Sequence, residues 1–182
     1  MAVFARKITR GKWGPTVGLS DEEISADAVT GDLRTTNRTL SFWRCGEEDE
    51  SSLGDVVLAL ASGADRVDVV DLAWLAESDV TEKRLDVVES QGSTPVEELR
   101  KRHVDIGRLD LERLGTVARL IRGALDNSRF KRFTKAEVVN LLVKAVSEDR
   151  LKLDALKRDV AEEVQKKMPP PTTDATRDPA RE

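Results

Sequence analysis

Hydrophobic and polar residues alternate along four short segments of the chain, and this alternation is typical of half-buried β-strands. The four segments are 2–9, 37–45, 66–75 and 83–90. The stretch 76–82 between the last two is polar and short enough for a hairpin loop. We therefore expect the strands at 66–75 and 83–90 to pair antiparallel.

Apolar residues three or four positions apart predict helices in the remaining segments. A capping box formed by Ser20 and Glu23 begins one helix. The apolar run 53–61 fits a short helix or a strand, and the polar and glycine residues that flank it favour the helix. Everything from Thr94 onward has a helical pattern, with a further capping box at Thr134. Apolar stripes predict the last three helices, at 111–125, 138–146 and 153–164.

Together these elements predict an α+β protein with a small, mostly antiparallel sheet in its N-terminal half and a helical C-terminal half. Residues 1–92 form the α+β layer and residues 93–168 the helical layer, either around one common core or as two domains. The segment 169–182 begins with three consecutive prolines and contains almost nothing apolar. This composition predicts a disordered tail.

Composition limits the chemistry of the chain. Among 182 residues there are one histidine, His103, one cysteine, Cys45, and no tyrosine, whereas 35% of the residues are charged. A catalytic triad would have to use His103 as its base, and a zinc site lacks a close His/Cys pair. We expect His103 on the surface near a helix end and Cys45 in the core. No sequence motif indicates a cofactor.

Two features of the sequence indicate the cellular compartment: the single cysteine and the absence of a long apolar run. One cysteine cannot form an intramolecular disulfide, so a reducing, cytoplasmic compartment is expected. No stretch approaches the roughly 18 apolar residues of a membrane-spanning helix, and we expect no membrane partner.

A basic cluster near the predicted helix start at Thr134 is the first candidate site. Cations alternate there with Phe130 and Phe133, an arrangement that suits phosphate contacts and base stacking. The alternative is that the two phenylalanines join neighbouring helices and leave the cations in water. The candidate nucleic-acid-binding residues are Arg122, Arg129, Lys131, Arg132 and Lys135.

Two carboxylates of the predicted hairpin, Asp71 and Glu89, are the second candidate site. If they converge they could hold a divalent cation, as in metal-dependent nucleases or phosphodiesterases. Acidic residues on neighbouring strands also arise by chance in any acidic protein, and a solvated strand face is the alternative.

The apolar stripe of the last predicted helix is the third candidate. It includes Val160, Val164 and Met168, and it either packs on its own domain or contacts a partner. With few catalytic side chains and a charged surface, the sequence favours a non-enzymatic interaction or regulatory protein. Its expected partner is another protein or a second copy of the chain. Nucleic-acid binding is the alternative, and a metal-dependent nuclease is the third hypothesis.

Overall fold

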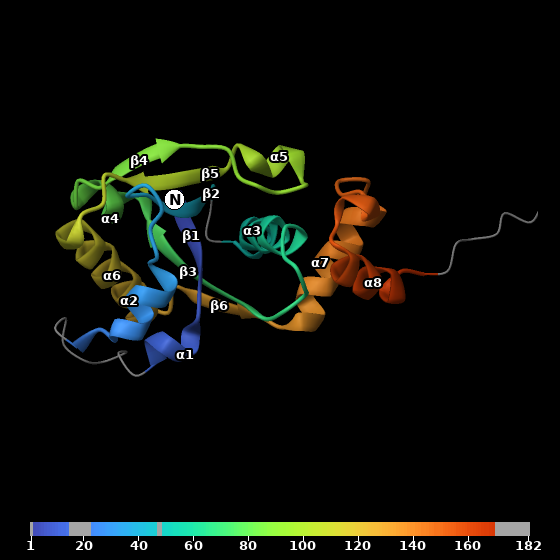
Figure 1. Ribbon diagram of the computed structural model, residues 1–182, viewed down its shortest axis with the longest axis horizontal. Coiled ribbons are helices and arrows are strands. Elements are labelled where there is room, and N and C mark those ends of the chain that lie inside the picture. Colours follow the sequence, from blue (N-terminus) through green and yellow to red (C-terminus); the bar gives the residue numbers. More distant parts are fainter. Residues whose placement is uncertain (1, 15–22, 47–48, 170–182) are drawn as a thin grey trace, which may run out of the picture.

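The computed structural model describes residues 2–14, 23–46 and 49–169. Its centre is an antiparallel sheet of six strands in the order β4-β5-β2-β1-β3-β6 (Figure 1). The strands are β1 (Val3–Ile8), β2 (Leu40–Cys45), β3 (Val70–Ala76), β4 (Asp86–Glu89), β5 (His103–Gly107) and β6 (Phe130–Phe133).

Helices cover both faces of the sheet, so the fold has three layers (Figure 1). One face carries α1 (Arg10–Trp13), α2 (Ala26–Asp32), α4 (Glu77–Glu82) and α6 (Leu111–Asp126). The other carries α3 (Glu50–Ser62), α5 (Glu97–Arg100), α7 (Lys135–Ser147), the 3-10 turn η3 (Leu153–Ala155) and α8 (Arg158–Lys167). α3 packs on α7, and α7 on α8.

Strand β3 shows why the sheet is covered on both sides. Successive side chains of a strand point to opposite faces. Leu72 and Trp74 accordingly belong to the core under α3 and α7, whereas Ala73 and Leu75 belong to the core under α6. Every residue of β3 is buried. Apolar surface of β3 therefore leaves water on both faces of the sheet, and this strand contributes to both hydrophobic cores.

The α+β class and the mostly antiparallel sheet predicted from the sequence are confirmed. The segments 2–9 and 37–45 contain β1 and β2, and 53–61 lies within α3. The capping box at Thr134 forms as predicted: its hydroxyl accepts a hydrogen bond from the backbone N–H of Glu137, whose carboxylate accepts one from the backbone N–H of Thr134.

The predicted hairpin between 66–75 and 83–90 is wrong. Residues 77–82 form the helix α4 instead of a turn, so the chain leaves β3 and returns at the opposite edge of the sheet. There β4 pairs with β5, whereas β3 pairs with β1 and β6. The loop length suited a hairpin, but buried Val80 gives this segment a reason to fold as a helix against the core.

Two strands also lie within the segment that we predicted to be helical throughout. β5 and β6 have only five and four residues, too few for their alternation to stand out from a helical pattern. The strong start signal at Thr94 leads to α5, which is one turn long. Each hydrophobic core contains residues from both 1–92 and 93–168.

Two expectations concern residues outside the described ranges. The capping residue Ser20 is one of them; within the described chain, α2 begins at Ala26. The predicted disordered tail 169–182 also lies outside these ranges, apart from Pro169. Within the described ranges, none of the helices combines the length and the apolar character needed to cross a membrane.

The packing of α8 gives a first testable prediction. Val164 is fully buried, so Val164→Ala removes two buried methyl groups and should lower the free energy of unfolding by about 2 kcal/mol. The control is Val69→Ala, because Val69 is 37% exposed; it should cost less than about 1 kcal/mol. Urea denaturation measures both. Equal effects would show that α8 is not part of the core.

Candidate functional site

The two carboxylates proposed as a metal site do not come together. Asp71 lies on β3 and Glu89 on β4, and three strands separate these two in the sheet. Four inter-strand steps correspond to roughly 19 Å, too far to share one ion. In the described part of the chain no group of three potential ligands could hold a metal ion. The predicted pair is therefore wrong as a metal centre.

Asp71 instead makes a structural ion pair with Arg132. Arg132, its neighbour across the β3–β6 pair, donates two hydrogen bonds to the carboxylate at 2.7 and 2.9 Å, and the backbone N–H of Arg10 donates a third. Burial alone would raise the pKa of Asp71, but these hydrogen bonds outweigh it and hold the pKa below its usual value. Asp71 therefore stays ionised as a link between β3, β6 and α1.

The five predicted nucleic-acid-binding residues do not share one surface. Arg122 is buried in α6. Lys131 and Arg132 are adjacent in β6, so their side chains point to opposite faces of the sheet. Arg129 pairs with Asp79 at 2.7 Å, and Lys135 with Glu163 at 3.1 Å. Phe133 is buried and cannot stack on a base. Nucleic-acid binding through these residues stays a prediction. The structure does not bring the five side chains together on one surface.

The apolar stripe of the last helix is covered by the chain itself. Val160 and Val164 have no exposed surface, and Met168 packs against the same core while partly buried. Val160 and Val164 are therefore not available to a partner on the folded surface, whereas a contact through the partly buried Met168 stays a prediction. The sequence showed the stripe correctly, but only the fold shows that α7 already occupies it.

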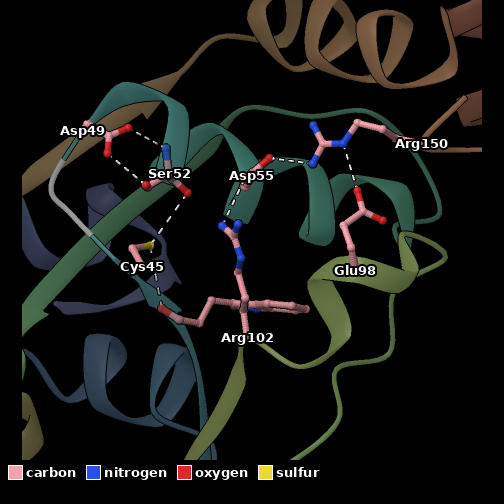
Figure 2. A network of polar contacts seen from close by, with 8 residues as sticks. Cys45, Asp49, Ser52, Asp55, Glu98, Arg102 and Arg150 are labelled. Atoms are coloured by element: carbon pink, nitrogen blue, oxygen red, sulfur yellow. Dashed lines mark hydrogen bonds and ion pairs between the residues drawn. The ribbon is translucent and has the colours of Figure 1, made fainter. Parts of the chain in front are cut away.

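His103 and Cys45 are both part of the framework. His103 begins β5 rather than ending a helix, lies edge-on against the ring of Trp43, and has its Nδ1 2.7 Å from the hydroxyl of Ser90; burial lowers the pKa of His103. Cys45 is buried, as predicted. Its thiol lies 3.8 Å from the carbonyl oxygen of Ser52 (Figure 2).

A polar groove lies on the surface of the described part of the chain. It lies between the loop 91–95 and α5 on one side and the segment 149–157 on the other, and consists of two adjoining hollows of about 590 and 540 Å³. Pro95, Arg100 and Ala155 line both hollows and join them. We refer to it as the α5 groove.

The floor of the first hollow is fixed by buried hydroxyls. Ser62, the last residue of α3, and Thr94 lie with their hydroxyl oxygens 2.9 Å apart, and both are almost fully buried. Arg100 fixes the loop from above: its Nε donates to the carbonyl oxygen of Thr94 at 2.9 Å, and its own carbonyl accepts from the backbone N–H of Gly92. These hydrogen bonds tie the loop to α3 and α5.

A polar network around Asp55 holds two residues that line the second hollow, Glu98 and Arg150. Figure 2 shows this network. The Asp55 carboxylate, on α3, accepts from Arg102 at 3.0 Å and from Arg150 at 2.9 Å. Arg150 also donates to Glu98 of α5 at 2.9 Å. The hydrogen bond that Arg150 donates to Asp55 raises the pKa of Arg150 despite its partial burial. α3, α5 and the segment after α7 are thus joined through two arginines.

The charge of the lining differs between the two hollows. Arg100 and Lys157 line the first, and none of the described residues that line it is acidic. The second has both signs, with Glu97, Glu98 and Asp149 beside Arg100, Arg150 and Lys152. The groove is therefore cationic at one end and mixed at the other.

The sequence alone did not reveal this site, because its walls come from segments far apart in the chain. One local signal existed. At Gly92 an added Cβ would lie 2.5 Å from the ring of Trp43 and 3.0 Å from Cβ of His103. Only glycine lets the loop lie this close to β2 and β5, but the sequence does not show which side chains it approaches.

Comparisons of the chain with protein-family models, with curated proteins and with solved structures give no match.

The burial of Cys45 gives a second testable prediction. Desolvation by burial raises the pKa of its thiol to about 12, so the reactive thiolate is scarce even at pH 10. Iodoacetamide should alkylate the folded chain at least about 100-fold more slowly at pH 8.5 than the urea-unfolded chain. Comparable rates would contradict the burial.

The raised pKa of Cys45 also determines how the stability of the folded chain changes with pH. The raised pKa means that the folded chain keeps a proton that the unfolded chain releases. The stability that comes from this proton is present below the pKa of the unfolded thiol and is lost as the pH rises above it.

Proposed function

We propose that this chain is a non-enzymatic docking protein that binds an extended, polar segment of a protein partner in the α5 groove. The observation that carries the proposal is the groove itself: two adjoining polar hollows whose floor and walls are held by named hydrogen bonds. A preformed recess binds with less ordering of the protein. A cytoplasmic location, expected from the single cysteine, is part of the proposal.

The dimensions and charges of the groove support a peptide segment as its occupant. The two hollows together exceed the space that a single small polar group needs, and their lining changes from cationic to mixed charge along the groove. An extended segment with acidic residues at one end and both charges at the other would complement this lining. Such complementarity gives specificity more than raw affinity.

Three ionisable or nucleophilic side chains that could take part in catalysis are buried or paired within the fold, and this supports a binding role. Cys45 is buried with a raised pKa, and Asp71 is paired with Arg132. Asp86 accepts hydrogen bonds from Arg108 and Arg113, which lower its pKa. These three groups therefore stabilise the fold, and their contacts leave them poorly placed to reach a substrate.

Charge reversal in the groove gives a third testable prediction. Lys152 is exposed, makes no ion pair in the described part of the chain, and lines the mixed hollow. With tagged full-length chain in extract from the native host, wild type should recover a protein partner in near-equal amount. Lys152→Glu should reduce that recovery about tenfold or more, because it places a like charge against the partner's acidic groups.

The matched control is Lys83→Glu, which changes net charge equally at the end of α4 on the other face of the sheet. It should recover the partner as wild type does. Recovery of the same protein by all three chains would show that docking occurs elsewhere. Failure of wild type to recover any protein would contradict the docking function.

A further inference from the structure

The cationic hollow of the α5 groove has the composition of a binding site for an oxyanion. Its lining combines Arg100 and Lys157 with hydroxyl and amide side chains. Among the described residues of this lining there is no carboxylate to neutralise the two cations or to repel an anion. In a recess partly removed from water, an arginine and a lysine attract a negative group more strongly than on an open surface.

Arg100 is held in position with hydrogen-bonding capacity to spare. Its Nε is used by the carbonyl oxygen of Thr94, which fixes the plane of the guanidinium. No contact of its two Nη groups is found in the described ranges, and four N–H bonds remain for a ligand. A planar fork with its orientation already set suits carboxylate or phosphate oxygens.

Gln91 and Ser93 supply neutral donors beside it. Both side chains are exposed, both line the same hollow, and neither has a polar partner among the residues that the structure describes. The buried hydroxyls of Ser62 and Thr94 bond to one another beneath them. The side chains of Gln91 and Ser93 therefore have hydrogen-bond donors free for a ligand, whereas the hydroxyls beneath them already bond to each other.

Lys157 can turn toward the hollow at low cost. It pairs with Asp65 at the start of the segment after α3, but the two side chains are 56% and 89% exposed. Ion pairs this exposed contribute little to stability, and Asp65 does not line the hollow. A bound anion could therefore replace Asp65 as the partner of Lys157.

We infer that the hollow lined by Arg100, Lys157, Gln91 and Ser93 binds an oxyanion, the carboxylate or phosphate group of the docked segment. This inference rests on the proposed docking function only for the origin of the anion. The site itself requires no partner. It would recognise an acidic or a phosphorylated residue at one end of the segment and thereby set its direction in the groove.

The test is a titration of the ¹⁵N-labelled full chain with sodium phosphate, and separately with sodium acetate, at constant ionic strength. Saturable shifts are expected for the backbone amides of residues 62–63 and 91–94. Tighter binding of phosphate would indicate a phosphorylated residue in the partner, and binding of acetate as tight as that of phosphate would indicate an acidic one.

Gln91→Glu places a carboxylate in the hollow without touching the floor and should weaken binding of either anion about tenfold or more. Gln165→Glu makes the same chemical change on an exposed position of α8 outside the groove and should leave binding unchanged. Arg100→Gln should abolish saturation while the remaining spectrum keeps its native dispersion. Linear shifts in wild type, or equal affinities in Gln91→Glu and Gln165→Glu, would overturn the inference.

The two proposals fail separately. If neither anion saturates but Lys152→Glu still loses the partner, docking stands and the oxyanion site is refuted. If the anions bind and respond to Gln91→Glu but no groove variant affects the partner, the oxyanion site stands and docking in the groove is refuted.

Discussion

The Asp55 carboxylate joins three parts of the chain that nothing in the local sequence brings together. It accepts hydrogen bonds from Arg102, which precedes β5, and from Arg150, which comes after α7; Arg150 in turn reaches Glu98 on α5. Only 18% of the Asp55 side chain is exposed, so these contacts are screened less than surface ion pairs. The position of the segment 149–157 against α5, and with it the α5 groove, depends on this carboxylate.

The groove is therefore a product of packing between layers. The sheet and its two cores fix α3 and α7, the Asp55 network fixes the segment 149–157 relative to α5, and Arg100 fixes the loop 91–95. The donors of Arg100, Gln91 and Ser93 that stay unsatisfied lie on the surface of the recess and face solvent. A frame of this kind is suited to binding, because the backbone that carries the donors is already ordered before a ligand binds.

Local signals predicted the parts of the fold that depend on neighbours in sequence. The Thr134 capping box forms because its two hydrogen bonds join residues three apart, and β1 and β2 match the alternation of their segments. The position of β4 at the far edge of the sheet could not be read this way, because strand order depends on contacts across the whole sheet. The α5 groove was hidden for the same reason: Ser62, Arg100 and Lys157 are far apart in the chain.

A double-mutant cycle on Asp55 and Arg150 tests most directly whether this contact supports the groove. The free energy of unfolding would be measured by urea denaturation for Asp55→Asn, Arg150→Gln and the combined variant. A direct contact predicts a coupling energy of at least about 1 kcal/mol, because either single change neutralises one partner and already removes the ion pair between the two side chains. Strictly additive effects would show that the two residues do not interact in solution and would contradict the account of the groove.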